Sequence, residues 1–353
     1  MADQKALDAR ALRAVLDQLL QRRSLSEAQG AQVLRALTDP GLAPAVAAGI
    51  LIALRAKGVV ADELRGFARA MRELARRPLL PPDLRAIDIV GTGGDSSGSL
   101  NLSTGTALLV ASCGLPVIKH GNRSISSRSG SADVLEQLGL HVPLDEAAAA
   151  QCLAATGFTF LFAPHYHPAM KALAPIRAAL GVRTIFNIMG PLTNPAAPPL
   201  ALIGAYDLPT ATLIAEALAA SAVERVFVVH AENGWDEPTP ICPFTLLDVR
   251  AGRVSTSERS AADYGLASCD AVSLAGADAA YNAAALRAVL SGTERGAHRD
   301  ALLLGASLAL EIAGVATDPR AGVALAAAAI DDGRAATTLA RLAEFGHQHK
   351  AVS

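Results

Sequence analysis

The stretch Lys119-His-Gly-Asn-Arg-Ser-Ile-Ser-Ser-Arg-Ser-Gly-Ser-Ala-Asp-Val-Leu-Glu-Gln-Leu-Gly139 follows a predicted strand, 116–119, and runs into a predicted helix, 132–138. Lys119 and Arg123 can donate charge-assisted hydrogen bonds to a polyphosphate, and the serine-rich run after Arg123 can donate neutral ones. A solvated turn rich in Arg and Ser is the alternative interpretation. Because the stretch lies between a strand and a helix, we favour a phosphate-binding loop in an α/β fold.

A second glycine-rich stretch, Gly91-Thr-Gly-Gly-Asp95, follows the β-branched segment Ile87-Asp-Ile-Val90. A helix is expected next, with Asn101 or Ser103 as its N-cap. This order of strand, glycine loop and helix aims backbone N–H groups at an anion. The motif matches neither the dinucleotide-binding nor the P-loop pattern, and Gly-Gly turns are common. Asp95 fits a ligand hydroxyl or a metal-bound water better than a phosphate.

The composition limits the class of protein. With 353 residues, of which 51% are hydrophobic and 4% aromatic, the chain can form two domains, or one large α/β domain with an attachment, around an aliphatic core. Its 31 basic and 33 acidic residues give a net charge of −2, which disfavours nucleic-acid binding. Short apolar runs and an N-terminus without a signal core favour a cytoplasmic protein with no membrane partner. Four scattered cysteines fit free thiols.

The first 77 residues are expected to be helical. Apolar residues recur at helical spacing from Leu12 to Leu20, and Ser24 with Glu27 is expected to form a capping box. No catalytic group of residues appears here, so a packing or dimerisation module is favoured. Three prolines after residue 77 mark a linker, and they divide the chain into a helical domain, 1–77, and an α/β domain, 78–353.

Two histidines and an arginine lie in the middle of the chain. A single helix is expected from Pro164 to Leu180, and it contains His165, His167 and Arg177. The histidines could bind a metal, but a third ligand is missing, and the lining of a pocket for a small aromatic molecule is favoured. Arg177 fits either a surface arginine with a packed stem or a carboxylate receptor, and the residues alone leave both open.

Adjacent carboxylates, Asp236 and Glu237, follow a later predicted strand. They can hold Mg²⁺ together with waters and phosphates, whereas a lone Asp-Glu pair is more often a solvated loop. The two predicted phosphate loops favour the metal site. The elements expected after residue 199 are strands 200–206, 225–230 and 244–249 and helices 209–220, 279–290, 301–315 and 320–330.

Six motifs in sequence order resemble the anthranilate phosphoribosyltransferase family. They are Gly91-Thr-Gly-Gly-Asp95, Asn101-Leu-Ser-Thr104, Lys119-His-Gly-Asn-Arg123, Ser129-Gly-Ser-Ala-Asp133, Gly190-Pro-Leu-Thr-Asn-Pro195 and Asp236-Glu237. The resemblance covers nearly the whole chain. It implies a nucleoside-phosphorylase-like α/β fold, with a small helical N-terminal domain onto which segment 176–196 packs. It also implies a larger α/β domain with a central, mostly parallel sheet, and a homodimer.

The resemblance also implies an activity and a site. The reaction would transfer the 5-phosphoribosyl group from phosphoribosyl pyrophosphate to anthranilate, giving N-(5-phosphoribosyl)anthranilate and pyrophosphate, the second step of tryptophan biosynthesis. The residues implied to bind phosphoribosyl pyrophosphate are Gly91, Thr92, Gly94, Asp95, Asn101, Ser103, Thr104, Lys119 and Ser131. Those implied to bind anthranilate are Gly91, His120, Asn122, His167 and Arg177. Ser103, Asp236 and Glu237 would hold two Mg²⁺ ions.

The acidic motif departs from the family pattern at Ala231, Trp235 and Pro238, where the family usually has a His-Gly and a Gly-Leu-Asp-Glu sequence. Three alternative functions remain open. One is transfer to a related aromatic amine. The second is a pyrimidine-nucleoside phosphorylase, which the Asp236-Glu237 pair and the loop from Lys119 argue against. The third is a nucleic-acid-binding relative, which the net charge does not favour.

Overall fold

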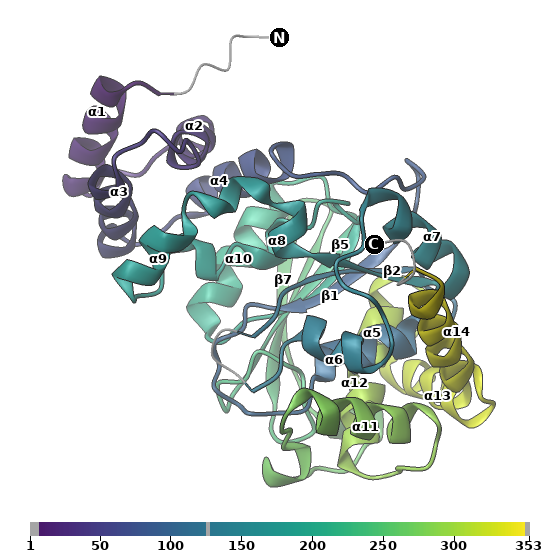
Figure 1. The fold of residues 1–353 in the computed structure, drawn as a ribbon. Coiled ribbons are helices and arrows are strands. Elements are labelled where there is room, and N and C mark those ends of the chain that lie inside the picture. The colour runs from purple at the N-terminus through teal and green to yellow at the C-terminus, as the bar shows by residue number, and fades with distance from the viewer. Residues whose placement is uncertain (1–6, 125–127, 350–353) are drawn as a thin grey trace.

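Four helices at the N-terminal end form a bundle beside a larger α/β unit (Figure 1). The computed structural model describes residues 7–124 and 128–349. The bundle consists of α1 (Ala9–Leu20), α2 (Glu27–Leu37), α3 (Pro44–Lys57) and α4 (Ala61–Glu73). The expected capping box is misplaced by two residues, because Ser26 and Gln29 form it: Gln29 N donates to Ser26 Oγ at 3.3 Å, and Ser26 N donates to Gln29 Oε1 at 2.9 Å.

A seven-stranded sheet forms the centre of the larger unit, in the order β3-β2-β1-β4-β5-β6-β7. The strands are β1 (Ile87–Gly91), β2 (Val117–Gly121), β3 (Phe158–Phe162), β4 (Leu200–Gly204), β5 (Arg225–Ala231), β6 (Phe244–Arg250) and β7 (Arg253–Arg259). Strands β1 to β5 are parallel, and β6 and β7 are antiparallel, so the predicted mostly parallel sheet is confirmed. Strand β7 was not predicted, because nearly all its side chains are exposed and it lacks the alternating apolar pattern.

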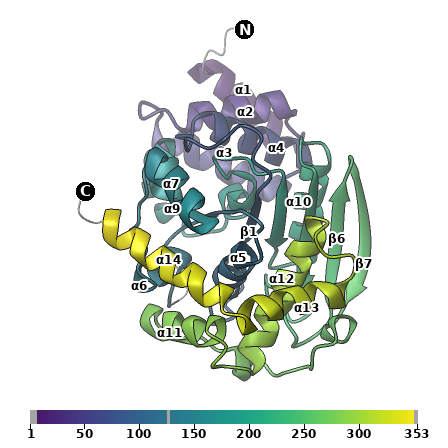
Figure 2. The ribbon, with the colours of Figure 1, turned by 90° about the vertical axis from the view of Figure 1, so that its right-hand side faces the viewer.

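Both faces of the sheet are covered, because successive strand residues point to opposite sides. In β4, Leu200 and Leu202 face one apolar core, while Ala201 and Ile203 face the other. The first core includes residues of α5 (Leu102–Ser112), α12 (Ala297–Ile312) and α13 (Pro319–Asp331), and the second includes α10 (Leu208–Ala219) and the N-terminal bundle. Figure 2 shows α12, α13 and the C-terminal helix α14 gathered at the end of the molecule away from the bundle.

The remaining helices complete the α/β unit: α6 (Ser131–Gln137), α7 (Glu146–Thr156), α11 (Ala279–Leu290) and α14 (Arg334–His349), with the short 3₁₀ turns η4 (Ala261–Tyr264) and η5 (Val272–Leu274). Helix α14 was not predicted. Its buried positions, among them Ala335, Thr338, Leu342 and Phe345, recur at helical spacing, so the pattern was present in the sequence and was missed. No helix in the described ranges combines the length and apolarity needed to cross a membrane.

The helix predicted from 164 to 180 is wrong, because the chain forms three shorter pieces there. These are α8 (Ala163–Tyr166), η1 (Pro168–Lys171) and α9 (Ala174–Leu180). Each piece carries a proline at its first or second position, where the missing N–H costs nothing, and the chain changes direction between them. Helix α9 then contacts α3 of the bundle (Figure 1), and the turns η2 (Ile185–Asn187) and η3 (Gly190–Leu192) follow.

Candidate functional site

The candidate site lies at the carboxyl ends of β1, β2 and β4, where Asp236 packs against the strand ends. A side chain at Gly91 or Gly204 would overlap with Asp236, so both positions require glycine for this close approach. Asp236 Oδ2 accepts a hydrogen bond of 2.6 Å from Gly93 N, and Asp236 N approaches Asp95 Oδ2 at 3.4 Å. The first glycine loop therefore folds around the first carboxylate of the acidic motif.

The glycine loop requires left-handed backbone at Gly93 (φ 69°) and Gly94 (φ 77°), which explains its Gly-Gly pair. Thr92 is the residue just before this pair, and its Oγ1 accepts a hydrogen bond from Tyr206 N at 3.3 Å. Asp95 Oδ1 accepts from Ser97 N at 3.1 Å, which closes the turn. Hydrogen bonds within the loop, and one from Tyr206 just after strand β4, therefore stabilise its conformation.

Strand β2 continues two residues beyond its predicted end, so Lys119 lies inside the strand. Its side chain is buried. Its Nζ donates to Ile89 O and, at 3.2 Å, to Ser103 Oγ. Burial lowers the pKa of Lys119, while the negative charges of Asp88 and Glu237 act in the opposite direction. A buried ammonium thus lies beside the predicted metal ligand Ser103.

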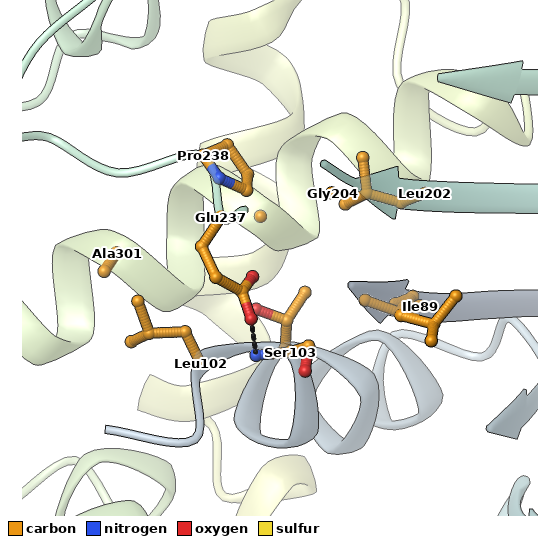
Figure 3. A pocket seen from close by; sticks show the side chains of 11 residues that line it. Ile89, Leu102, Ser103, Leu202, Gly204, Glu237, Pro238 and Ala301 are labelled. Atoms are coloured by element: carbon orange, nitrogen blue, oxygen red, sulfur yellow. Dashed lines mark hydrogen bonds between the residues drawn. The ribbon is translucent and has the colours of Figure 1, made fainter. Parts of the chain in front are cut away.

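Glu237 lies above the first turn of α5, and its Oε1 accepts a hydrogen bond from Ser103 N at 3.2 Å (Figure 3). Burial raises the pKa of Glu237 to about 7, with Asp95 adding to the shift and Lys119 opposing it. Burial also raises the pKa of Asp236 well above its usual range, and the charges of Glu237 and Asp95 add to that shift. A cavity of about 10 Å³, room for one water molecule, adjoins Ser103 and Glu237.

We call Asp95, Ser103, Lys119, Asp236 and Glu237 the carboxylate side of the site. It holds three carboxylates for one ammonium group, so it is short of positive charge. Across the described ranges no group of three or more acidic, histidine or cysteine ligands is arranged to hold a metal by itself. A cation bound here would therefore need oxygen ligands from water or from a second ligand as well.

Asn101 begins helix α5 but does not cap it, contrary to expectation, and Ser103 lies within the helix. The side chain of Asn101 instead donates from Nδ2 to Ser129 O at 3.2 Å. Thr104, in the same first turn, is fully buried, and its Oγ1 has no hydrogen-bond partner in the described structure. Asn101 therefore links the N-terminus of α5 to the second predicted phosphate loop.

In that second loop, Ser131 Oγ donates to Asn122 O at 3.2 Å, and the side chain of Asn122 is exposed. Arg123, predicted to donate to a polyphosphate, is instead paired with Asp133 at 2.8 Å and with Glu136 at 2.6 Å. The part of the predicted serine run at Ser126 and Ser127 lies outside the described residues.

His120 and His167 meet in the interior, with 3.2 Å between their Nε2 atoms and ring centroids 5.1 Å apart. Burial lowers the pKa of His120 to about 3 and that of His167 to about 4. Both rings are therefore neutral near pH 7, and the N–H of one donates a hydrogen bond to the bare nitrogen of the other. His165, the other histidine of the motif, stacks edge-on against Tyr166 and lies 3.8 Å from Glu146.

Arg177 lies on α9 with its guanidinium 5.2 Å from the ring centroid of Phe186. Its guanidinium is partly buried, which lowers its pKa, and it forms no side-chain hydrogen bond or ion pair within residues 7–124 and 128–349. We call His120, His167 and Arg177 the histidine side of the site. It contains a cation without an anionic partner and two neutral rings.

Sequence reasoning missed two supports of the site. Asp88 is buried in β1, where its carboxylate accepts from His120 N at 3.2 Å and from Asn194 Nδ2 at 2.9 Å. Burial raises the pKa of Asp88 to about 6, although Lys119 opposes the shift. A charged residue inside the apolar run 87–90 was the signal that could have revealed it.

The second missed support is Arg183, whose guanidinium donates to Gly94 O and lies 4.2 Å from the ring centroid of Tyr206. Arg55 of helix α3 donates to Arg183 O at 2.7 Å, so the N-terminal bundle is connected to the glycine loop. No motif marks this arginine in the sequence. The unusual Trp235 is also accounted for, because its side chain is buried in the core.

Comparison with known proteins first gives the class. The chain matches the glycosyl transferase family, with the helical bundle domain over residues 13–75 and the a/b domain over residues 83–336. This combination defines a glycosyl transferase built from a helical bundle and an α/β domain.

Individual relatives narrow the class. The anthranilate phosphoribosyltransferase of Rhodospirillum rubrum is 45% identical over 320 residues, covering 91% of each chain, and that of Methylocella silvestris is 43% identical, covering 96% of each. The structure of the Thermus thermophilus enzyme matches with a TM-score of 0.87 at 39% identity, covering 94% of this chain and 99% of that one. The Saccharomyces cerevisiae enzyme in complex with PRPP and Mg matches with a TM-score of 0.87 at 25% identity, covering 97% and 99%. The chain belongs to the anthranilate phosphoribosyltransferase family.

Proposed function

We propose that the protein transfers the 5-phosphoribosyl group of phosphoribosyl pyrophosphate to the amine of anthranilate, releasing pyrophosphate, as the second step of tryptophan biosynthesis. The observation that carries the proposal is the opposite electrostatic character of two half-sites that adjoin at Lys119 and His120 in β2. The carboxylate side has buried acids short of positive charge. The histidine side has a cation, Arg177, short of an anion.

The carboxylate side fits phosphoribosyl pyrophosphate and Mg²⁺. Mg²⁺ is commonly held by one or two carboxylates together with waters and substrate phosphates, and the buried Asp236 and Glu237 supply such a pair. We assign Ser103, Asp236 and Glu237 to two ions, since Asp236 faces Gly93 whereas Glu237 faces Ser103. The proposed phosphoribosyl pyrophosphate ligands are Gly91, Thr92, Gly94, Asp95, Asn101, Ser103, Thr104, Lys119 and Ser131.

The histidine side fits a small aromatic acid. A partly buried guanidinium without a counter-ion favours a carboxylate, and the neutral edge-on rings of His120 and His167 offer an apolar wall with polar tips. Gly91 and Asn122 complete the proposed anthranilate set, at the ends of the strands that lead to both loops.

Chemically, the bond between ribose C1 and a pyrophosphate oxygen breaks, and the anthranilate nitrogen forms the new bond to C1. Pyrophosphate leaves with the electron pair, and the amine loses a proton after attack. Bound Mg²⁺ would stabilise the charge that develops on the leaving group. Lys119 adds a fixed positive charge on the same side. An aromatic amine is nucleophilic when neutral, so positioning and charge stabilisation supply most of the acceleration.

We also propose how the chain divides into domains, how it assembles and where it is located. We assign residues 1–77 and the segment 176–196 to a helical domain, because the second core joins residues of α1–α4 with Ile185 and Leu192. Residues 78–353 then form the phosphoribosyl-transfer domain. We propose a homodimer through the helical domain and a cytoplasmic location.

The test follows the loss of anthranilate fluorescence when purified protein is mixed with anthranilate and phosphoribosyl pyrophosphate, with and without Mg²⁺. The expected result is a rapid Mg²⁺-dependent loss that the double variant Asp236→Asn, Glu237→Gln abolishes. Folded wild-type protein that leaves anthranilate fluorescence unchanged would refute the proposed function.

A further inference from the structure

The backbone at residues 274–276, far along the chain, forms hydrogen bonds with the segment that follows the first glycine loop. Just before helix α11, Leu274 O accepts a hydrogen bond of 2.9 Å from Leu100 N, and Gly276 N donates to Gly98 O at 2.8 Å. A Cβ on Gly276 would lie 2.5 Å from Ser99 O, so the two backbones are in close contact. This segment therefore forms a wall along the chain that leads from the glycine loop to helix α5.

The hydrogen bonds continue through the side chain of Asn282, which lies on α11 and is 2% exposed. Asn282 Oδ1 accepts from Ala277 N at 2.8 Å, and Asn282 Nδ2 donates to Asn101 Oδ1 at 2.8 Å. Asn101 Nδ2 in turn donates to Ser129 O at 3.2 Å. The first member of this series is a backbone N–H that can only donate, and the last is a carbonyl that can only accept. The two ends therefore determine the orientation of both amides.

This series explains why Asn101 does not cap helix α5. An asparagine at an N-cap position usually accepts a hydrogen bond from the second or third helical N–H. Here the side-chain oxygen of Asn101 accepts a hydrogen bond from Asn282, and Asn101 forms no capping hydrogen bond with the helix. Without Asn282 that oxygen would be released toward the helix, and its amide would turn away from Ser129.

We propose that Asn282 is a positioning residue for phosphoribosyl pyrophosphate, which holds Asn101 and the loop at Ser129 in the geometry that receives the substrate. This inference rests on the proposed function. Asn282 is buried behind Asn101 and acts through it. Its contribution is expected to favour one substrate, because its hydrogen bonds reach Asn101, a proposed phosphoribosyl pyrophosphate ligand, and none of His120, His167 or Arg177.

The test is steady-state kinetics on Asn282→Asp, which keeps the acceptor for Ala277 N and removes the donor to Asn101. We expect the KM for phosphoribosyl pyrophosphate to rise about tenfold, the effect of roughly one hydrogen bond, with the KM for anthranilate within about twofold of wild type. Asn282→Ser, too short to span Ala277 and Asn101, should behave alike and replaces the Asp variant if that one does not fold.

Two further variants separate positioning from general loosening of the fold. Arg287 ties the same helix to Gln137 O without touching Asn101, so Arg287→Ala should lower the Tm and leave both KM values unchanged. On an Asn101→Ala background, Asn282→Asp should have no further effect on KM. An unchanged KM for phosphoribosyl pyrophosphate in Asn282→Asp, or an equal rise on the Asn101→Ala background, would overturn the inference. An inactive wild-type protein would instead reject the proposed function.

Discussion

The carboxylate side and the histidine side adjoin at Lys119 and His120, which are neighbours in β2, but they differ in their electrostatics. Burial and the charge of neighbouring carboxylates, Asp95 among them, raise the pKa values of Asp236 and Glu237, so the first side resists its own negative charge. Burial lowers the pKa values of His120 and His167, so the second side resists positive charge, apart from Arg177. Each half is electrostatically incomplete in the opposite sense. We therefore propose that the two substrates, one with metal and one with a carboxylate, complete the site.

Removal of the buried ammonium should have the largest effect. Lys119→Met is expected to lower kcat/KM by roughly a hundredfold to a thousandfold, because a fixed charge near the leaving group is lost. It should also lower the Tm, since Asp88 would lose a compensating charge. Fluorescence kinetics and thermal denaturation measure both. Lys57→Met, which breaks the buried pair with Glu63 in the bundle, is the control and should lower only the Tm.

Arg177 tests the histidine side alone. Arg177→Gln should raise the KM for anthranilate about tenfold to a hundredfold, as expected for loss of a charged hydrogen bond, and leave the KM for phosphoribosyl pyrophosphate unchanged. Arg177→Lys should recover part of the loss, because the charge returns without the planar fork. A normal KM for anthranilate in Arg177→Gln would show that the guanidinium serves another purpose.

The pH dependence of stability should differ in sign between the two sides. A carboxyl with a raised pKa binds protons more tightly in the folded state, so its stabilising contribution is present at low pH and is lost as the pH rises. For Glu237 the window runs from the ordinary glutamate pKa of 4.5 to about 7. Metal-free wild type should lose on the order of 2 kcal/mol between pH 5 and pH 8 through this site. The double variant Asp236→Asn, Glu237→Gln should not, as measured by urea unfolding.

The histidine pair should give an effect in the opposite direction, and the smallest effect for each single group. Its pKa values are lowered from 6.5 to about 3 and 4, so the unfolded chain binds more protons and stability falls as the pH drops below 6.5. At pH 5.5 the expected loss is on the order of 1 kcal/mol per ring. His120→Asn, His167→Asn should flatten this acid limb, whereas the exposed His347→Asn should leave it unchanged. Identical acid limbs in all three proteins would contradict the neutral pair.

Local motifs predicted much of the fold and indicated a candidate site, and long-range contacts explain the rest. The strand before Gly91 and the helix after it follow from residue type and glycine, and both are confirmed. The prediction that Asn101 caps the helix is wrong, because its side chain accepts a hydrogen bond from Asn282, 181 positions away. Such a partner leaves no local signal in one sequence.

Helical breaks were also hard to predict. Between 163 and 180 the apolar pattern favours one helix, but prolines begin a new piece three times. The same turns bring His167 to His120 and lead the chain to Arg183, which holds Gly94 from the bundle side. The residues were visible in the sequence, whereas their contacts depend on the packing of two domains.

The most direct test of the two-sided account is a matrix of KM values for both substrates in Glu237→Gln and Arg177→Gln at saturating Mg²⁺. The account predicts that Glu237→Gln raises the KM for phosphoribosyl pyrophosphate alone, and that Arg177→Gln raises the KM for anthranilate alone. Equal increases for both substrates in either variant would contradict the division of the site into a carboxylate side and a histidine side.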